Sequence, residues 1–453
     1  MKKYDSYKDS GIEWIGEIPS HWEEYRLGVI GRFSSSGIDK KIIEDEPHVM
    51  IINYTDVYGN KEMILNSKKE YMVVTTPQSK IEQHSVKKGD LIFTPSSETK
   101  EDIGLSAVVV DDLENTAFSY HVLRFQFNQV VDLQFKKYLC NNNIVLNYFS
   151  KNSKGTTRQI LGREDFKNAK VVIPPLDEQT AIANFLDRKT SEIDEIIADK
   201  KRLLELYEEE KTAIINKAVT KGINPDAPMK DSGIEWLGEI PEHWEVKKIK
   251  HLLKKKKGAL KTGPFGSQLK NSDLDSSGEY KVYTQRNVLD NDFIEGDDKI
   301  NEVKFQSLKE FLIEDGDILF TSRGTIGVCN VFPADSEPGI LHPCLIRIQI
   351  DRDRVHQDWI INYVNNSSLF IDNVKYESNA TTIEVIYGGT LKETALPVPP
   401  IKEQQSIVQH IEAECSRIDF KKARTEELIE LLTEYRTALI SEAVTGKIKI
   451  IED

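Results

Sequence analysis

The chain has few cysteines, no long apolar run and no excess of positive charge. The cysteines are scattered through 453 residues, without the paired spacing of a metal site: Cys140, Cys329, Cys344 and Cys415. We expect reduced thiols, as in the cytoplasm. No run approaches the ~18 apolar residues of a membrane-spanning helix, which argues against any membrane association. The segment from Met1 to Asp5 lacks the apolar stretch of a signal peptide.

The charge balance is acidic, with a formal net charge of −14 at pH 7. Taken alone, this balance argues against nucleic-acid binding, because DNA and RNA are themselves negatively charged. Positive charge is nevertheless dense between Lys247 and Lys257. A lysine run of this kind is typical of a solvated face and does not by itself indicate a ligand.

Signatures of catalysis are missing. The segment Gly258–Pro264 resembles a phosphate-binding loop, but Pro264-Phe265 stands where that loop needs Lys followed by Ser or Thr. No Gly-x-Gly-x-x-Gly follows an apolar strand, and no His-x-x-x-His pair occurs. We interpret His21 and His243, which stand beside tryptophans, as packed structural histidines. The pattern predicts no catalytic site and no cofactor on this chain.

A long internal repeat is the main feature that the sequence does contain. The sixteen residues Lys8–Glu23 return at Lys230–Glu245 with two substitutions. A second anchor pairs Ile173–Gln179 with Val398–Gln404. A period of this length has the size of a domain and is too long for a solenoid repeat. The chain is therefore predicted to contain two copies of one unit.

Each second anchor begins a long helical pattern. Apolar residues recur at steps of three, four and seven from Ile182 to Ile215 and again from Ile407 to Ile440. Charges of both signs fill the other positions, as on a coiled coil. The pairs that begin at Pro174 and Pro399 suit helix entry, and Gly222 suits the exit of the first helix. Each helix is predicted to span about 45 residues, or about 67 Å if straight.

A mixed α/β stretch precedes each helix, with short apolar runs separated by Gly, Asp, Asn and Ser. The predicted strands are Val49–Ile52, Leu91–Phe93, Ala107–Val110 and Val122–Phe125 in the first copy, and Tyr280–Tyr283, Asp317–Phe320 and Leu345–Ile350 in the second. The copies agree locally, as at Gly89–Thr94 and Gly316–Thr321, but their loops differ. A repeated scaffold with different loops holds two versions of one surface.

The order of domain, helix, domain, helix predicts the connectivity. The first helix ends where the second domain begins, and the second helix begins where that domain ends. If both ends lie near that domain, the helices are antiparallel. We therefore predict an α+β fold with two similar domains, joined by two long antiparallel coiled-coil helices and related by pseudo-two-fold symmetry.

Polar loops rich in Gly, Ser, Thr, Lys and Arg supply the binding chemistry. They are Ser34–Lys41, Asn53–Tyr58, Thr94–Ser97 and Lys154–Gln159 in the first copy, and Lys261–Lys270, Tyr283–Asn287, Thr321–Gly327 and Ser378–Thr382 in the second. Small residues let a backbone approach phosphates, while Arg and Gln reach base edges. Each loop alone is better explained as a surface turn. Together, on a duplicated scaffold, the loops favour recognition.

These segments resemble the DNA-specificity subunit of Type I restriction-modification systems. The resemblance rests on four segments in the family's order: Asp-Ser-Gly-Ile-Glu-Trp-Ile/Leu-Gly-Glu-Ile-Pro-x-His-Trp, the Pro-Pro-Leu/Ile-x-Glu-Gln helix starts, Lys217–Gly222, and Thr-Ser-Arg-Gly-Thr-Ile-Gly at Thr321–Gly327. It covers nearly the whole chain. It implies two target-recognition domains, each reading half of a bipartite site on double-stranded DNA, and two helices that set the spacing.

The resemblance also implies partners that hold the missing chemistry. Two modification (methyltransferase) subunits would dock on the helices through Glu178, Gln179, Glu403 and Gln404. S-adenosylmethionine, ATP and Mg would belong to those subunits and to ATP-dependent restriction subunits, all in the cytoplasm. The acidic charge is then no obstacle to DNA binding, because partner surfaces would share the phosphate contacts.

The loop residues become DNA-contact candidates. Because Thr94–Glu98 stands where the second copy has Thr321–Gly324, Arg323 is a candidate and Glu98 is not. The candidates in the first domain are Lys40, Lys41, Asn53, Tyr54, Ser96, Thr156, Thr157 and Arg158. Those in the second domain are Lys261, Ser267, Gln268, Arg286, Ser322, Arg323, Thr325, Thr381 and Thr382.

The predicted boundaries are 1–176 for the first recognition domain, 177–223 for the first long helix, 224–400 for the second domain, and 401–453 for the second helix and tail. Two alternatives stay open. One is the specificity subunit of a related system whose partner fuses cutting and methylation in one chain. The other is a non-DNA coiled-coil scaffold with protein-binding domains, which a test of sequence-specific DNA retention would separate.

Overall fold

The structure is a computed structural model that describes residues 2–12, 15–235, 237–366, 368–378 and 385–450. The chain forms two compact units. Unit 1 consists of Met1–Lys201 with Glu426–Asp453, and unit 2 of Arg202–Thr425. Each unit thus contains one mixed α/β domain and a part of each long helix, whereas the sequence-based boundaries set the helices apart from the domains.

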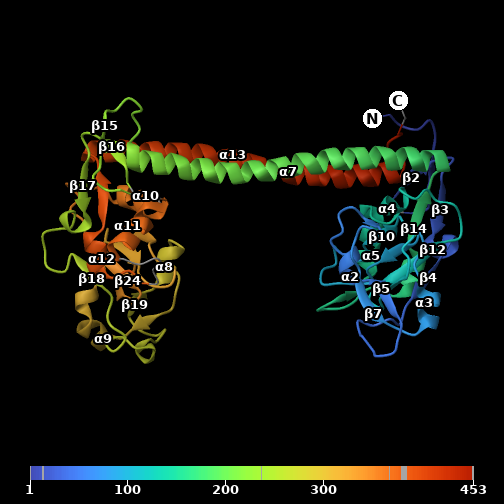
Figure 1. The fold of residues 1–453 in the computed structure, drawn as a ribbon, viewed down its shortest axis with the longest axis horizontal. Helices are drawn as coiled ribbons and strands as arrows, with labels where there is room; N and C mark the ends of the chain where they lie inside the picture. The colour runs from blue at the N-terminus through green and yellow to red at the C-terminus, as the bar shows by residue number, and fades with distance from the viewer. Residues whose placement is uncertain (1, 13–14, 236, 367, 379–384, 451–453) are drawn as a thin grey trace. The chain divides into compact units, whose positions relative to one another are not determined.

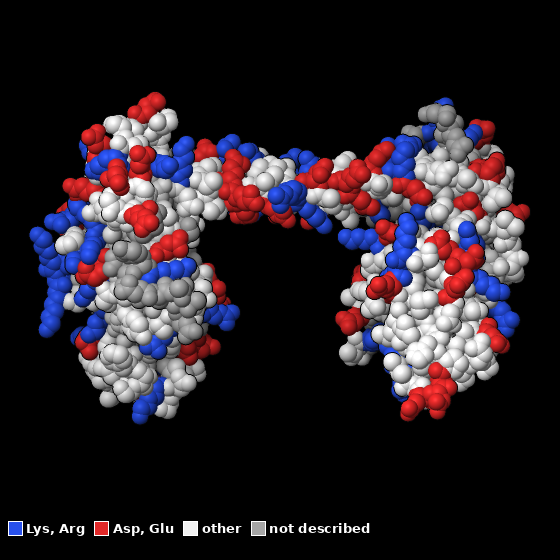
Figure 2. Space-filling model, viewed as in Figure 1, with Lys and Arg blue, Asp and Glu red and all other residues white. Residues whose placement is uncertain are grey.

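The two predicted long helices are present as α7 (Leu176–Lys221) and α13 (Ile401–Val444), drawn in green and red in Figure 1. Lys, Arg, Asp and Glu alternate along their surface (Figure 2). In unit 2, Lys211 Nζ lies 2.9 Å from Asp419 Oδ1, and Lys422 pairs with Glu208. Residue numbers rise on α7 as they fall on α13, so the antiparallel prediction is confirmed.

Unit 1 is built on two sheets. Its mixed sheet has the order β4 (Gly31–Ser35), β12 (Leu123–Phe127), β8 (Leu91–Phe93), β10 (Ser106–Val109) and β6 (Ile64–Leu65). A second sheet has the order β11 (Thr116–Phe118), β5 (His48–Ile52) and β7 (Met72–Thr75), with β11 parallel to β5. Short ladders pair β1 (Tyr7–Asp9) with β2 (Glu17–Pro19), β3 (Glu23–Arg26) with β14 (Lys170–Ile173), and β9 (Ser96–Ser97) with β13 (Gln159–Ile160). The helices are α1 (Leu27–Ile30), α2 (Tyr54–Val57), α3 (Gln78–His84), α4 (Lys136–Leu139), α5 (Asn143–Asn152) and α6 (Arg163–Asn168).

Unit 2 repeats this plan with fewer strands among its described residues. One sheet has the order β18 (Leu260–Thr262), β24 (Leu345–Ile348), β21 (Ile318–Thr321) and β22 (Cys329–Val331). The other has the order β20 (Lys299–Ile300), β19 (Tyr280–Tyr283) and β23 (Gly339–Leu341), with β23 parallel to β19. The ladders are β15 (Met229–Asp231) with β16 (Glu239–Pro241) and β17 (Glu245–Lys248) with β25 (Ala395–Val398). The helices are η1 (Ile249–His251), α8 (Gln285–Leu289), η2 (Asn271–Asp273), α9 (Glu302–Ser307), η3 (Lys309–Phe311), α10 (Gln357–Asn366), α11 (Ser368–Ser378) and α12 (Gly388–Glu393).

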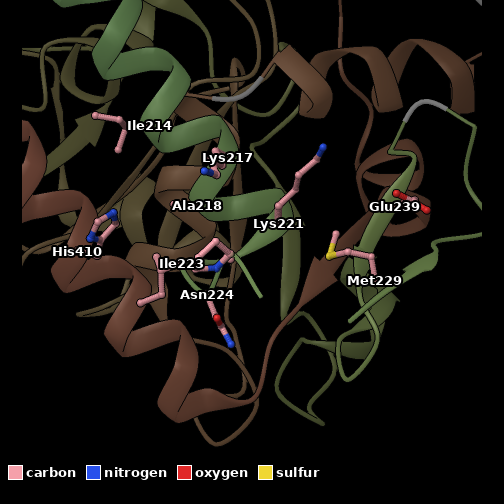
Figure 3. A pocket seen from close by; sticks show the side chains of 11 residues that line it. Ile214, Lys217, Ala218, Lys221, Ile223, Asn224, Met229, Glu239 and His410 are labelled. Atoms are coloured by element: carbon pink, nitrogen blue, oxygen red, sulfur yellow. The ribbon is translucent and has the colours of Figure 1, made fainter. Parts of the chain in front are cut away.

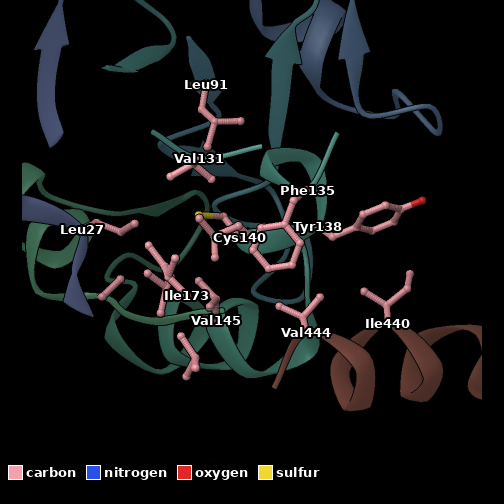
Figure 4. Close-up of a cluster of buried hydrophobic side chains, with 14 of the residues drawn as sticks. Leu27, Leu91, Val131, Phe135, Tyr138, Cys140, Val145, Ile173, Ile440 and Val444 are labelled. Atoms are coloured by element: carbon pink, nitrogen blue, oxygen red, sulfur yellow. The ribbon is translucent and has the colours of Figure 1, made fainter. Parts of the chain in front are cut away.

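The core of each unit extends from the domain onto the long helices. In unit 1, Ile440 and Val444 of α13 belong to the same buried cluster as Phe135 and Tyr138 (Figure 4). Tyr138 also donates a hydrogen bond of 2.6 Å to Asp187 Oδ1 of α7. The apolar seam read from the sequence therefore packs against its domain as well as against the other helix, because a helix stripe must be buried somewhere to be stable.

The repeated sixteen-residue segment forms a clasp at the helix ends of unit 1. Trp22 is fully buried, and its Nε1 donates to Glu178 Oε2 at the start of α7 over 3.0 Å. The same indole lies beside Gly446, just after the end of α13, so closely that a Cβ there would be 3.1 Å from Trp22 Cζ3. One tryptophan thus joins the beginning of one long helix to the end of the other.

Unit 2 contains the same clasp. Trp244 Nε1 donates to Glu403 Oε1 at the start of α13 over 3.0 Å, and its ring lies against Gly222 after α7. His243 Nε2 is 2.7 Å from Glu403 Oε2 with a side chain that is 48% exposed, and His21 of unit 1 is 47% exposed at 2.5 Å from its glutamate. The prediction of packed histidines is therefore wrong in burial: both are surface residues that hold the clasp glutamate.

Candidate nucleic-acid interface

The polar loops of unit 2 gather at one end of its sheets. Gly263, just after β18, donates its backbone N–H to Leu345 O at the start of β24 over 2.9 Å. Gln285 of α8 donates from Nε2 to Thr325 O over 3.0 Å, which ties the loop after β19 to the loop after β21. Three of the loops singled out in the sequence therefore form one surface.

Exposed candidates on this surface of unit 2 are Ser267, Gln268, Arg286, Arg323 and Thr325. Arg286 is 89% exposed and pairs with Asp290 over 3.2 Å.

One candidate of unit 2 is corrected, and another forms an ion pair within the chain. Ser322 is 2% exposed and donates its hydroxyl to Cys344 O over 2.8 Å, so it supports the loop from inside. Lys261 lies on β18, where its Nζ is 2.5 Å from Glu310 Oε2 and above the ring of Phe311. The amine is thus already paired within the chain. Thr381 and Thr382 lie outside the described residues.

The lysine run of unit 2 lies at the opposite sheet end from these loops. Leu253, which precedes Lys254, pairs with Ile350 beyond the end of β24, whereas the candidate loops lie at its start. Lys256 pairs with Glu314 over 3.3 Å. The topology therefore separates the lysine run from the candidate interface, in line with its interpretation as a solvated face.

The loops of unit 1 gather in the same way. Tyr120, after β11, donates its backbone N–H to Ile38 O in the loop after β4 over 3.1 Å. Ser119 N–H donates to Ile52 O at the end of β5 over 2.9 Å. Leu161 N–H donates to Pro95 O in the loop after β8 over 2.9 Å. Segments far apart in the sequence thus meet at the carboxyl ends of several strands.

A stacked cluster at the centre of this surface holds three predicted residues together. The guanidinium carbon of Arg158 lies 5.6 Å from the ring centroid of Tyr54, and its Nε donates to Ser96 Oγ over 3.1 Å. The Tyr54 ring stacks on Tyr58 with a centroid distance of 5.1 Å and an interplanar angle of 20°. Tyr58 in turn donates to Asp102 Oδ2 over 3.2 Å. Arg158 is exposed but held, which is how a preorganised contact residue is built.

The other candidates of unit 1 divide into exposed and buried ones. Lys40, Lys41, Thr156 and Thr157 are exposed, and Asp39 holds the pKa of the Lys41 ammonium above its usual value through a hydrogen bond. Asn53 is corrected: it is 4% exposed, caps α2 by accepting from Tyr54 N–H over 3.0 Å, and accepts from Ser119 Oγ over 3.0 Å. Its amide shapes the loop and is not available to DNA.

The sequence reading missed Tyr120 and His121, which belong to the same surface. Tyr120 is 49% exposed, and its ring centroid lies 3.8 Å from that of His121. Partial burial, together with the positive charges of Lys40 and Arg158, lowers the pKa of His121 and favours its neutral ring. No local pattern marks these residues, because β11 pairs in parallel with a strand about 66 residues earlier.

A buried ion pair braces the sheet of each unit at the end away from the loops. In unit 1, Arg124 Nη1 of β12 lies 4.0 Å from Asp90 Oδ2, and Gln126 Nε2 donates to Asp90 Oδ1 over 3.2 Å. In unit 2, Arg347 Nε lies 3.7 Å from Asp317 Oδ2. Burial raises the pKa of both aspartates against the opposing effect of the arginines. The sequence showed an Arg-x-Gln in both strands, but it did not show that a buried aspartate faces it.

Comparison with known proteins places this geometry in a family. The sequence model of the Type I restriction modification DNA specificity domain matches residues 19–206 and again residues 241–430. The chain belongs to this family. Its two matches begin at the two copies of the repeated segment and end within the two long helices.

Curated members of the specificity-domain family match most of the chain. It is 24% identical to a protein named "Putative type I restriction enzyme MjaX specificity subunit" from Methanocaldococcus jannaschii, over 96% of both chains. It is 23% identical to the EcoKI specificity subunit of Escherichia coli, over 81% of this chain and 76% of that one.

Two solved structures share the fold. One, from work on complex assembly and conformational transition of the type I R-M system, covers 95% of this chain and 99% of its own at a TM-score of 0.64 and 15% identity. The HsdS subunit from Thermoanaerobacter tengcongensis covers 95% and 98% at a TM-score of 0.57 and 15% identity. At this identity the likeness concerns the fold alone.

The four residues that the family resemblance suggested for partner contacts have roles inside the chain. Gln179 and Gln404 are 3% and 0% exposed. Gln179 Oε1 accepts from Asp132 N–H over 2.8 Å, and Gln404 Oε1 accepts from His356 N–H over 2.7 Å. Their assignment to partner binding is therefore corrected to the anchoring of each helix on its own domain. Glu178 and Glu403 hold the two clasps described above.

A cavity of about 490 Å³ in unit 2 lies between the end of α7, α13 and β15. Figure 3 shows Lys217, Lys221, His410 and Met229 around it. Within the described ranges no cluster of His, Cys, Asp and Glu is arranged to hold a metal ion. No described helix is long and apolar enough to cross a membrane.

Proposed function

We propose that this chain is the sequence-specific DNA-recognition subunit of a Type I restriction-modification complex, in which each unit reads one half of a bipartite site. The observation that carries the proposal is the convergence of loops from several strands at one sheet end in both units. The sheets of the two units are equivalent while their loops differ, as expected of a duplicated recognition domain with two DNA targets. Membership of the DNA specificity family supports the same conclusion.

Exchange of one recognition domain tests this division of labour. Residues 24–172 would be replaced with the matching segment of a relative of known target, and the chain assembled with its modification subunits. Methylation mapping should then show one half-site changed and the other kept. A change in both half-sites, or in neither, would contradict independent reading by the two units.

We propose further that the chemistry belongs to partners. Modification subunits would hold S-adenosylmethionine, and restriction subunits would hold ATP and Mg. The purified chain should not transfer label from S-adenosylmethionine to DNA, and transfer should begin when modification subunits are added. Label transfer by the chain alone would contradict the proposal.

The long helices offer an apolar surface for docking these modification subunits. Four side chains of unit 1 are exposed there at 39 to 53%: Ile196, Leu428, Leu431 and Tyr435. Covering a fully exposed side chain of this kind contributes about 1.5 to 3 kcal/mol, and about half of that is available at Leu431, so Leu431→Glu should weaken assembly roughly 4-fold or more. Ile42→Glu is the matched control, because Ile42 is 74% exposed away from the helices. Co-elution of each variant with the modification subunits at several concentrations measures the difference in affinity. Equal assembly of both variants would show that the docking surface lies elsewhere.

A further inference from the structure

A short ladder beside the loop surface aligns the two units residue by residue. In unit 1, Ile160 pairs with Ser96, and Leu161 N–H donates to Pro95 O. In unit 2, Val385 pairs with Arg323, and Ile386 N–H donates to Ser322 O over 2.8 Å. Ser96 and Arg323 are therefore structural counterparts on one side of the ladder.

The arginine changes sides between the units. In the sequence, Arg158 stands two residues before Ile160, and Ile383 stands two residues before Val385. Unit 1 thus has Arg158 beside Ser96, whereas unit 2 has Arg323 at the position that Ser96 occupies in unit 1. Each unit supplies one guanidinium from this ladder. In unit 1 the arginine comes from the segment before Ile160, and in unit 2 it comes from the segment after β21.

The contacts of Arg158 hold its guanidinium in place and leave one edge of the group available to a ligand. Its Nε is used by Ser96 Oγ, and its face is used by Tyr54, which stacks on Tyr58. Among the described residues, no hydrogen bond or ion pair engages its Nη1 or Nη2 atoms. Two parallel N–H donors on a fixed plane match the O6 and N7 acceptors of guanine in the major groove.

The contrast between the units decides between a base and a phosphate as the ligand. Every half-site has the same sugar-phosphate backbone, so a phosphate contact would be expected at the same position in both units. The arginine instead stands in different segments of the two units, at position 158 in unit 1 and at position 323 in unit 2, as expected of a residue that reads sequence. The rigid stack points the same way, because a phosphate contact does not need a fixed side-chain plane.

We infer that Arg158 and Arg323 are counterpart specificity-determining residues, each reading a guanine in the half-site of its own unit. This inference rests on the proposed DNA-recognition function. It adds which residue of each unit reads a base, which base is read, and that Arg158 and Arg323 are equivalent across the ladder.

The test compares Arg158→Ile and Arg158→Lys in the complex with modification subunits. Methylation mapping gives the sites, and competition binding with the four bases at each position of the first half-site gives the preference. We expect Arg158→Ile to lose the preference for guanine at one position by roughly 5- to 150-fold, with the second half-site unchanged. Arg158→Lys keeps the charge without the planar fork, so we expect it to lose the preference as well.

Three outcomes would contradict the inference. If Arg158→Ile weakened all sequences equally and lowered the salt slope by about one, the contact would be a phosphate contact. If Arg158→Lys kept the full wild-type preference, the planar fork would not be what reads the base. If the base preference of the Arg158→Ile complex matched that of the control Lys88→Ile complex, Arg158 would not read any base. Lys88 is exposed before β8, at the sheet end away from the loops. A wild-type complex without any sequence preference would instead contradict the proposed function itself.

A transplant tests the equivalence across the ladder. Adding Ser96→Arg to Arg158→Ile places the residues of unit 2 on the frame of unit 1. We expect this double variant to regain a guanine preference in the first half-site, with Arg323→Ser in unit 2 abolishing the corresponding preference in the second. A double variant no more selective than Arg158→Ile alone would refute the equivalence.

Discussion

The buried pair of Asp90 and Arg124 should be one of the most sensitive points of unit 1. Both side chains are less than a tenth exposed, at 6% and 8%, and the Arg124 Nη1 to Asp90 Oδ2 distance is 4.0 Å. At that separation two unit charges attract by about 4 kcal/mol at an effective dielectric constant of about 20. Arg124 also donates to Ser34 Oγ over 3.1 Å and to Ser85 O over 2.5 Å. Arg124→Met would leave the buried Asp90 carboxylate without its counter-charge, and the two acceptors Ser34 Oγ and Ser85 O without this donor.

We expect Arg124→Met to destabilise unit 1 by about 3 to 5 kcal/mol, the usual cost of breaking a buried pair from one side. Arg32→Met is the matched control on the neighbouring strand β4, and its exposed side chain should cost under about 1 kcal/mol. Because the chain has two units, the loss should be read locally, from hydrogen exchange of the amides of β8 and β12 across a urea series.

The loss should depend on pH in a defined direction. Burial already raises the pKa of Asp90, and Arg124 opposes that rise, so its removal raises the pKa further. A carboxyl group with a raised folded-state pKa destabilises the fold as pH rises through that value. The penalty should therefore be largest at neutral pH and shrink toward pH about 4, near the unfolded-state pKa.

A double variant completes the test. Asp90→Asn removes the charge, so Asp90→Asn with Arg124→Met should be more stable at neutral pH than Arg124→Met alone. A loss for Arg124→Met that equals that of Arg32→Met, or that does not change with pH, would refute the reasoning from a buried ion pair.

Two further predictions concern the helices. Gly446→Ala should destabilise the clasp of unit 1, because Gly446 has φ +72° and a Cβ added there would lie 2.4 Å from Pro19 Cδ. In the control Gly59→Ala the backbone has a similar φ of +74°, but the added Cβ meets open space, so the difference in thermal unfolding between the two variants reports the clasp. One heptad inserted after Lys200 and one after Thr425 should keep the seam nearly in phase and lengthen each helix by about 10.5 Å, or about three base pairs of DNA. Methylation mapping should find the half-sites about three base pairs further apart, and an active complex with the original gap would show that the helices do not measure the distance.

The sequence predicted the elements whose signal is local. The seam from Ile182 to Ile215 repeats every few residues, so α7 was predicted almost to its ends, and runs such as Leu91–Phe93 gave β8. It did not predict β11 or β23, which are short and pair in parallel with strands far away in the sequence. Without those pairings, Tyr120 and His121 could not be placed beside Arg158.

Residue type alone also misled in a consistent way. Asn53 and Ser322 are polar residues in the loop segments, where polarity suggested binding, and Gln404 was assigned to partner contacts by the family resemblance. The structure uses each of them to satisfy backbone groups that the loops would otherwise bury unpaired, which costs about 1 to 3 kcal/mol per group. Only burial separates such supporting residues from contact residues, and burial is a property of the assembled fold.

The division between supporting and contact residues explains how one frame can read two different half-sites. In each unit a buried aspartate, an arginine and a glutamine tie neighbouring strands together at the sheet end away from the loops. Because that brace lies outside the loops, substitutions in the loops change which side chains are presented without removing the contacts that hold the sheet. The arginine that moves from position 158 in unit 1 to position 323 in unit 2 is such a change. This change alters which segment supplies the guanidinium donor, whereas the ladder that positions the arginine is kept in both units.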